Sequence, residues 1–173
     1  IVGTGSGFSY AELGTTHHSL EDIAIIRSIP NLQVCAPIDS LELEAQLREA
    51  VDTGRPTYIR IGKKGEPIHS DKNCALGIGK AQELKKGKEL IIMGIGPIIS
   101  EGLKARELLK KEGLEVAVAS MASVKPLDTN FLQNIISRGF HKWFVLEEHY
   151  KQGGLGTEIL DWINENSIQN VEV

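Results

Sequence analysis

Two adjacent histidines, His17 and His18, are the first residues of this sequence with an evident capacity for chemistry. A histidine ring titrates near neutral pH, so it can transfer a proton or hydrogen-bond a sugar or phosphate oxygen. The pair precedes a predicted helix, whose first free N–H groups favour an anion. Adjacent side chains diverge and no other Cys, His, Asp or Glu cluster has ligand spacing, so the sequence predicts no metal ligands. Taken alone, such a pair is more often structural than catalytic.

Two glycine-rich segments and one pair of acids could also bind a ligand or act on it. Gly94–Pro97 follows an apolar run, but the dinucleotide fingerprint needs a third glycine where Ile99 stands, so a tight turn into a helix is favoured. Gly153–Gly156 predicts a loop of close backbone approach. Glu147 and Glu148 end a predicted strand and could act as general acid and base, although carboxylates at the rim of a sheet are more often solvated.

The elements that must position these residues alternate between strands and helices. Apolar runs predict strands over residues 1–4, 32–36, 57–61, 90–93, 116–119 and 143–146, with a further short strand over 75–79. Helices are expected to begin at Ser19, at Asp39 or Ser40, after Pro97, at Asp128 and after Gly153. Ile99, Leu103 and Leu108 are expected to face inward. This alternation indicates an α/β fold with mainly parallel, doubly wound sheets.

The chain also divides into two regions, each with alternating predicted strands and helices. Residues 62–88 are rich in Gly, Lys, Asp and Asn and poor in apolar side chains, so we expect a domain boundary near residue 70. The domains would then span residues 1–70 and 71–173, the second being a small three-layer domain. The sequence opens with Ile1-Val-Gly and closes on the strand-like Asn170–Val173, so we expect both ends to lie inside elements of a longer polypeptide.

Composition excludes several classes of partner. The net charge is −4 over 173 residues, which leaves no excess of cations to replace the counterions of a nucleic acid. No run approaches the roughly 20 apolar residues of a membrane helix. Cys35 and Cys74 make no disulfide framework, and Cys35 lies in an apolar run typical of a small buried residue. A reducing cytoplasm is the expected location.

One long segment resembles a known family. Gly14–Val34, followed by Ala36–Asp39, resembles the segment that closes the pyrimidine-binding domain of transketolases. The later patterns Gly94–Pro97, Ser120–Asp128 and Val145–Glu158 resemble the C-terminal domain of that family, and also that of 2-oxoacid dehydrogenase β subunits and deoxyxylulose-phosphate synthases. The resemblance covers essentially the whole chain.

The resemblance implies a thiamine-diphosphate- and Mg²⁺-dependent transferase that moves a two-carbon ketol unit between sugar phosphates. His17 matches a family histidine that faces the cofactor and the substrate carbonyl. Arg27, Arg60 and Lys63 fall in the segments that bind substrate, Lys63 standing where relatives carry a phosphate-binding arginine. Leu13 and Gly5 depart from the family, which has an Asp and a His at those positions to contact the donor sugar.

The family also places essential parts elsewhere. The glutamate that activates the cofactor precedes the first residue of this sequence, and the diphosphate- and Mg²⁺-binding domain is a separate unit. These residues alone are therefore expected to bind no cofactor and to be inactive. We expect a homodimer, a separate N-terminal diphosphate-binding half, or both. A 2-oxoacid dehydrogenase β-like enzyme, a deoxyxylulose-phosphate synthase-like enzyme and a non-catalytic dimerisation or regulatory homologue are the alternatives.

Overall fold

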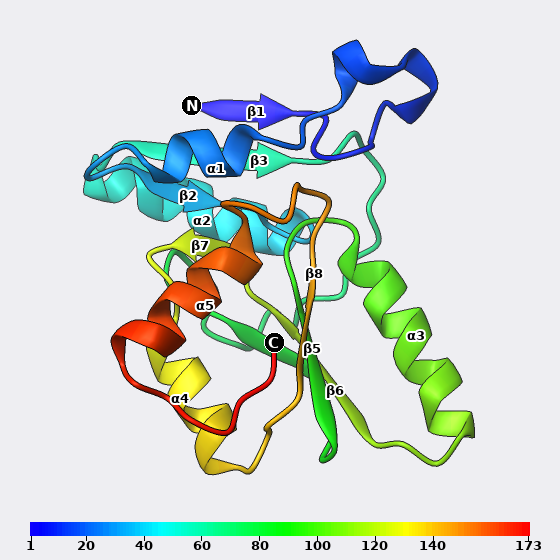
Figure 1. The fold of residues 1–173 in the computed structure, drawn as a ribbon. Coiled ribbons are helices and arrows are strands. Elements are labelled where there is room, and N and C mark those ends of the chain that lie inside the picture. The colour runs from blue at the N-terminus through cyan, green and yellow to red at the C-terminus, as the bar shows by residue number, and fades with distance from the viewer.

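A computed structural model describes residues 1–173 as two four-stranded, mainly parallel sheets (Figure 1). The first sheet has the order β1 (Val2–Thr4), β3 (Thr57–Ile61), β2 (Gln33–Cys35) and β7 (Ser123–Lys125). The second has the order β4 (Gln82–Lys85), β6 (Val116–Ser120), β5 (Leu90–Gly94) and β8 (Trp143–Leu146). Only the outer strands β7 and β4 are antiparallel to their neighbours. The predicted α/β class with mainly parallel sheets is confirmed.

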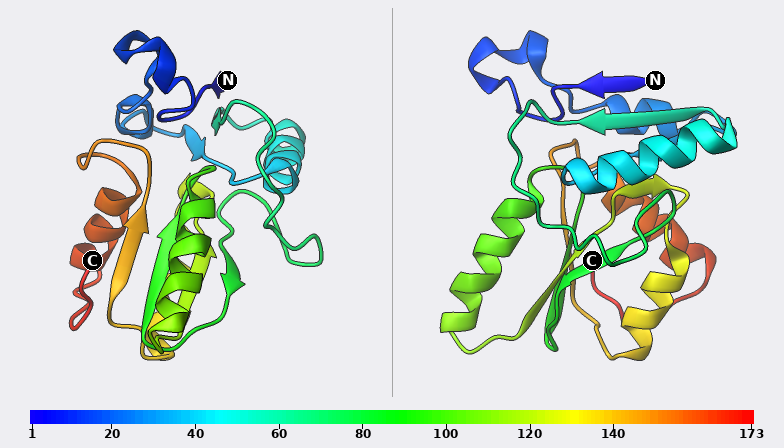
Figure 2. Two further views of the ribbon diagram at one scale, coloured as in Figure 1. Left: turned by 90° about the vertical axis from the view of Figure 1, so that its right-hand side faces the viewer. Right: turned by 180° about the vertical axis from the view of Figure 1, so that it is seen from behind.

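Helices cover both faces of each sheet (Figure 2). The first sheet lies between α1 (Asp22–Arg27) and α2 (Ser40–Thr53). The second lies between α3 (Ile99–Lys111) on one face and α4 (Thr129–Ser137) with α5 (Leu155–Glu165) on the other. Two short 3₁₀ turns, η1 (Ala11–Leu13) and η2 (Thr15–His17), lie in the loop before α1. No helix has both the length and the apolar character needed to cross a membrane.

The second sheet carries the larger core, because its central strands are buried on both faces. Ile91 and Met93 of β5 face α4 and α5, whereas Ile92 between them packs with Ile99 of α3. Alternate side chains of a strand point to opposite faces, so a continuous apolar run is what two helical layers require. The three-layer architecture therefore follows from the uninterrupted apolar sequence of β5 and β6.

The strand β7 links the two halves of the chain, and the sequence did not predict it. It follows β6 of the second sheet but pairs antiparallel with β2 of the first, with Val34 opposite Lys125 and Cys35 opposite Ser123. Val124, between these positions, is fully buried. The two sheets are thus joined by backbone hydrogen bonds, while the boundary near residue 70 stays a prediction.

Several local expectations can be compared with the structure. Asp39 caps α2 by accepting hydrogen bonds from two backbone N–H groups of its first turn, and Asp128 caps α4 in the same way through one, as predicted. The expected strand over 75–79 is wrong; the strand is β4, whose sequence Gln-Glu-Leu-Lys has no apolar run because it lies at the sheet edge. Ser19 does not cap α1, and Leu108 is 62% exposed rather than inward, since it lies on the outer side of α3.

Two acids at the start of α2 accept hydrogen bonds from the backbone, and one of them, Asp39, thereby binds the segment between β3 and β4. The Asp39 carboxylate accepts hydrogen bonds from the backbone N–H groups of His69 (2.8 Å) and Ser70 (2.7 Å), in addition to the two in α2. Glu42 is only 4% exposed, and its carboxylate accepts from the N–H of Ile38 at 2.9 Å. Burial raises the pKa of Glu42 to about 7, against the lowering effect of that hydrogen bond.

The buried Glu42 should make stability fall as the pH rises. Its folded pKa of about 7 exceeds that of an unfolded glutamate, so the folded state binds more protons between these values. We expect a loss of up to about 3 kcal/mol of unfolding free energy from pH 4.5 to 7.5, since one pKa unit corresponds to about 1.4 kcal/mol. Urea unfolding at both pH values should show this loss in the wild type and a smaller one in Glu42→Gln. Glu44→Gln, at an exposed position of α2, serves as the control; an identical pH dependence in all three proteins would contradict the assignment.

Candidate functional site

His17 lies in a loop whose two ends are joined by backbone hydrogen bonds. Gly7 and Ser19 exchange N–H···O bonds of 3.1 Å in both directions, which closes a neck below residues 8–18. Within the loop, His17 ends the 3₁₀ turn η2 and its side chain is exposed. Its Nδ1 lies 3.0 Å from the Thr16 hydroxyl, and its Nε2 makes no hydrogen bond in the chain. One ring nitrogen of His17 is therefore free to meet a ligand.

The neighbouring His18 is placed differently. Its ring packs edge-on against Phe8, with 4.9 Å between the ring centroids. Its Nε2 is buried and has no hydrogen-bond partner in the protein. The two histidines thus diverge as predicted from their adjacency, one into solvent and one into the loop.

Arg60 lies beneath the neck of this loop, on β3. Its side chain is only 2% exposed and pairs with the Asp22 carboxylate, Nε to Oδ2, at 2.9 Å. The same guanidinium donates to the backbone carbonyl of Ser19 and, at 2.8 Å, to that of Glu148. Tyr58 donates its hydroxyl to the same Asp22 oxygen at 2.8 Å, and burial with the adjacent carboxylate raises the pKa of Tyr58, so this donor keeps its proton.

Lys63, beyond the end of β3, lies against the same loop. Its ammonium is 3.0 Å from the Glu12 carboxylate and 4.7 Å from the centre of the Tyr10 ring. The side chain remains 41% exposed and lines a cavity of about 430 Å³ together with Asp39 and Pro97. Lys63 is therefore an accessible cation beside the loop of His17, as a phosphate-binding role requires.

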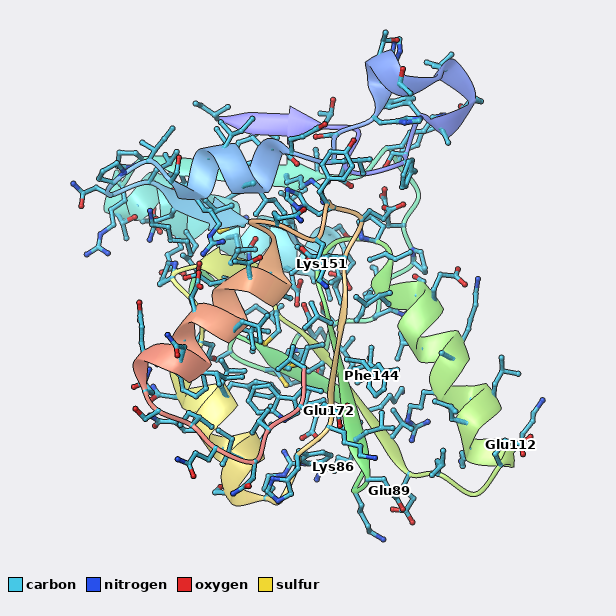
Figure 3. All side chains as sticks on the ribbon, in the orientation of Figure 1. Lys86, Glu89, Glu112, Phe144, Lys151 and Glu172 are labelled. Carbon is cyan, nitrogen blue, oxygen red and sulfur yellow. The ribbon has the colours of Figure 1, made fainter.

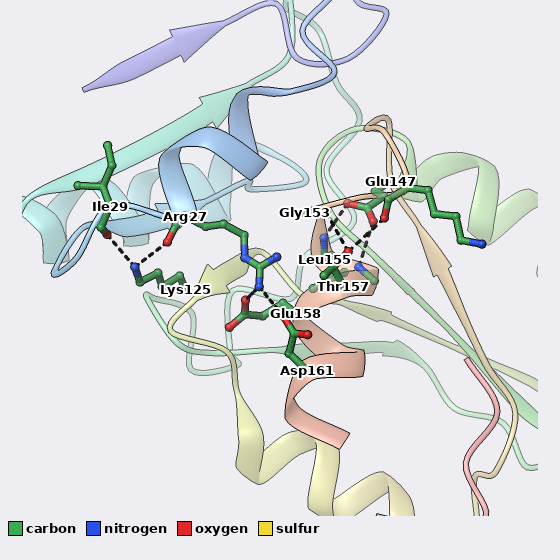
Figure 4. Close-up of polar contacts among 11 residues, drawn as sticks. Arg27, Ile29, Lys125, Glu147, Gly153, Leu155, Thr157, Glu158 and Asp161 are labelled. Carbon is green, nitrogen blue, oxygen red and sulfur yellow. Dashed lines mark hydrogen bonds and ion pairs between the residues drawn. The ribbon is translucent and has the colours of Figure 1, made fainter. Parts of the chain in front are cut away.

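Arg27 is engaged by the other half of the chain (Figure 4). Its guanidinium pairs with Glu158 and, at 3.0 Å, with Asp161, both on α5. Lys125 of β7 donates to the carbonyls of Arg27 and Ile29 at 2.8 Å each, and so supplies a cation to the C-terminal end of α1. The structure thus places Arg27 at the junction of α1 and α5, and substrate contact by Arg27 stays a prediction.

The glycine-rich segment and the acid pair form one structural unit. Glu147 accepts hydrogen bonds from the N–H groups of Leu155 (2.8 Å) and Gly156 (3.0 Å), so its carboxylate occupies the N-terminus of α5 (Figure 4). A Cβ at Gly154 would lie 2.6 Å from this carboxylate, and one at Gly153 would collide with Ala24 of α1. Glu147 is therefore a helix cap rather than a solvated group, a role that its sequence position did not reveal.

The two departures from the family pattern also have a structural context. Gly5 has φ +82°, and a Cβ there would lie 2.7 Å from the ring of Tyr10, so the loop accommodates only glycine at this position. Leu13 is 53% exposed on η1. Neither position offers a polar side chain to a donor sugar.

A separate cavity lies along β8. It has a volume of about 890 Å³, and Phe144, Lys151 and Glu172 line it, all three labelled in Figure 3. Glu147 also lines this cavity, but its carboxylate is already engaged by the start of α5. No group of three or more His, Cys, Asp or Glu side chains in the protein could hold a metal ion.

Two family models match the chain one after the other, and β7 of the first sheet lies within the second match. The model for the transketolase pyrimidine-binding domain matches residues 1–66, and that for the transketolase C-terminal domain matches residues 79–173. The chain belongs to the transketolase family. The resemblance inferred from the segment Gly14–Asp39 and from the later motifs is therefore confirmed.

Individual relatives include both separate subunits and larger enzymes. The chain is 30% identical over 169 residues to a subunit of the apulose-4-phosphate transketolase of Phocaeicola vulgatus, covering 97% of this chain and 54% of that protein. It is 32% identical over 170 residues to a putative transketolase C-terminal section of Methanocaldococcus jannaschii, covering 97% and 52%. It is 37% identical over 164 residues to the 1-deoxy-D-xylulose-5-phosphate synthase of Syntrophus aciditrophicus, covering 94% and 25%.

A solved structure agrees with the fold of this transketolase-family chain. The protein described as a split gene transketolase, inactive β4 tetramer, superposes with a TM-score of 0.83 at 32% identity, covering 95% of this chain and 53% of that one. The chain thus spans about half the length of the subunit-sized relatives that it matches.

Removal of the Glu147 carboxylate should destabilise α5. Glu147→Ala leaves two N–H groups without their partner, and loss of a helix cap costs about 1–2 kcal/mol. Urea unfolding should show this loss. Glu165→Ala, which removes an exposed acid from the other end of α5, should show none; equal stability of the two variants would argue against the cap.

Proposed function

We propose that this chain is the C-terminal part of a thiamine-diphosphate-dependent transferase that moves a two-carbon ketol unit between sugar phosphates. The observation that carries the proposal is His17, whose free Nε2 is exposed on a closed loop of the segment matched by the pyrimidine-binding domain. The family comparisons support thiamine diphosphate as the cofactor of the complete enzyme.

The residues of the chain fit one part of that cofactor's site. Thiamine diphosphate, when bound, supplies the electron sink for breaking and forming a carbon–carbon bond beside a carbonyl. The unpartnered Nε2 of His17 can hydrogen-bond the cofactor or stabilise negative charge developing on the substrate oxygen. The carboxylates of this chain do not converge on a metal site, so Mg²⁺ would be held by the diphosphate-binding half of the complete enzyme.

Lys63 is proposed to bind the phosphate of the substrate. Its ammonium is accessible beside the loop of His17, and a lysine can hold a phosphate as a point charge. Its contact with Glu12 is exposed and therefore weak, so an anionic substrate can compete for the ammonium. Substrate contact by Arg27 and Arg60 stays a prediction, since both guanidinium groups are engaged by carboxylates of the chain itself.

The proposed assembly joins this chain to a diphosphate-binding half, in a dimer of such units in the cytoplasm. Relatives named as a subunit and as a C-terminal section, each about twice as long as this chain, support a two-part enzyme. Formation of 1-deoxy-D-xylulose 5-phosphate is the second candidate, favoured by the 37% identity to such a synthase. The exposed Leu13 in place of a polar residue favours the non-catalytic alternative.

The proposal is tested by ketol transfer in the complete parent protein, combined with its diphosphate-binding half where that is a separate chain. With thiamine diphosphate, Mg²⁺ and phosphorylated donor and acceptor sugars, we expect transfer of a two-carbon unit. His17→Ala should lower kcat by about 10²-fold, the usual contribution of one acid–base group. His141→Ala, a histidine in the α4–β8 connection, is the matched control.

Each alternative has its own outcome in this assay. Calorimetric binding of thiamine diphosphate without ketol transfer would support the synthase if deoxyxylulose phosphate and CO2 form once pyruvate and a three-carbon aldose phosphate are supplied. Absence of cofactor binding would support the non-catalytic homologue. Unchanged turnover in His17→Ala would remove His17 from the mechanism.

Lys63 should act on substrate affinity rather than on chemistry. Lys63→Ala removes a cation that contacts the substrate equally in the ground and transition states, so KM for phosphorylated sugars should rise about 10-fold with little change in kcat. Kinetics with phosphorylated and unphosphorylated sugars measure this effect. Lys86→Ala, in the β4–β5 turn, should leave both constants unchanged. An equal rise in KM for unphosphorylated sugars would contradict phosphate binding by Lys63.

A further inference from the structure

The loop of His17 is narrow at its base, so its orientation depends on a few contacts there. Gly7 and Ser19 form the only antiparallel pairing between its two arms. The arm before Gly7 is held on the first sheet by Ser6, whose N–H donates to the Ile61 carbonyl at 3.0 Å. The arm after Ser19 continues into α1. Whatever holds this neck therefore sets the position of His17.

The segment between β8 and α5 reaches this neck from the C-terminal half of the chain. One nitrogen of the buried Arg60 guanidinium donates both to the Ser19 carbonyl, at the neck, and to the Glu148 carbonyl, after β8. A second contact is direct: a Cβ on Gly7 would collide with Cβ of Glu148 and lie 2.7 Å from its Oε2. The neck and this segment are thus in contact through both a hydrogen-bonded cation and close packing.

The same segment also holds the start of α1. The Tyr150 N–H donates to the Leu20 carbonyl at 2.9 Å, and the Ala24 N–H donates to His149 Nε2 at 3.3 Å. The Cα of Gly153 packs so closely on Ala24 that no side chain fits there. Residues 148–153, here called the β8–α5 strap, therefore contact the neck, Leu20 and α1.

We infer that the β8–α5 strap positions the loop of His17, with Arg60 and Glu148 as positioning residues. Its importance for catalysis rests on the proposed role of His17, whereas the coupling itself is a property of this chain. The coupling and the catalytic role of His17 can fail separately, because backbone protection in the loop can be measured without cofactor or turnover.

Hydrogen exchange of the backbone amides in the complete chain tests the coupling. Gly7→Ala places a methyl group against Glu148, so exchange at residues 7–19 should accelerate about 10-fold or more, as expected for local opening. Gly14→Ala is the control for backbone strain: Gly14 lies in the same loop, and its φ of +81° with ψ of −175° is at least as unfavourable for alanine as the φ of +56° at Gly7, but it has open space around it. We expect Gly14→Ala to accelerate exchange only in the turn that contains residue 14.

A compensating change separates the contact from backbone strain. Glu148→Gly in the Gly7→Ala background removes the colliding Cβ, so most of the lost protection should return. Equal acceleration in Gly7→Ala and Gly14→Ala, with no recovery in the double variant, would overturn the inference.

A milder pair of variants covers the case in which Gly7→Ala does not fold. Arg60→Lys, which keeps the positive charge but loses the guanidinium that joins the Ser19 and Glu148 carbonyls, should accelerate exchange at residues 7–19 about 3-fold, while Glu147→Ala should accelerate it only at the start of α5. Amides of the buried strand β6 report that each variant is folded. Unchanged exchange at residues 7–19 in Arg60→Lys would also overturn the coupling, whatever the cofactor and activity assays show.

Discussion

The buried guanidinium of Arg60 is the interaction on which the arrangement of the candidate site depends. A charge on a side chain that is only 2% exposed is stable only where ion pairs and hydrogen bonds replace its hydration. Arg60 obtains these partners from Asp22 on α1, from the Ser19 carbonyl at the loop neck and from the Glu148 carbonyl after β8. Because all three segments must converge on one cation, their relative positions are not independent.

The two halves of the chain are joined in a second way, through the shared first sheet. The strand β7 leaves the second sheet and pairs with β2, and its last residue, Lys125, also supplies two hydrogen bonds to the end of α1. Domains connected by a linker alone are expected to move relative to each other. Here a ladder of backbone hydrogen bonds and the Arg27–Glu158 pair oppose such motion. The short helix α1 is thereby held at both ends by the later half of the chain.

The role of the glycine-rich segment shows how a ligand-binding pattern can serve packing instead. A helix N-terminus after a run of glycines is a common anion site. In this transketolase-family chain the anion is a side chain, Glu147, and the glycines allow the loop to approach both that carboxylate and Ala24. This close approach brings the preceding β8–α5 strap against α1, so the motif contributes to the position of His17 without contacting it.

The sequence by itself determined the α/β class, the buried strands and the caps Asp39 and Asp128, because apolar periodicity and capping residues act over a few neighbouring positions. It also determined the family, through the segment Gly14–Asp39. Only the tertiary structure decided the pairing of β7 with β2 and the partners of Arg60, one of which is 88 residues away. Such contacts leave no local pattern: β4 and β7 are short edge strands, and a hydrogen-bond partner depends on how whole elements pack. The placement of His17 was therefore beyond what the spacing of residues could predict.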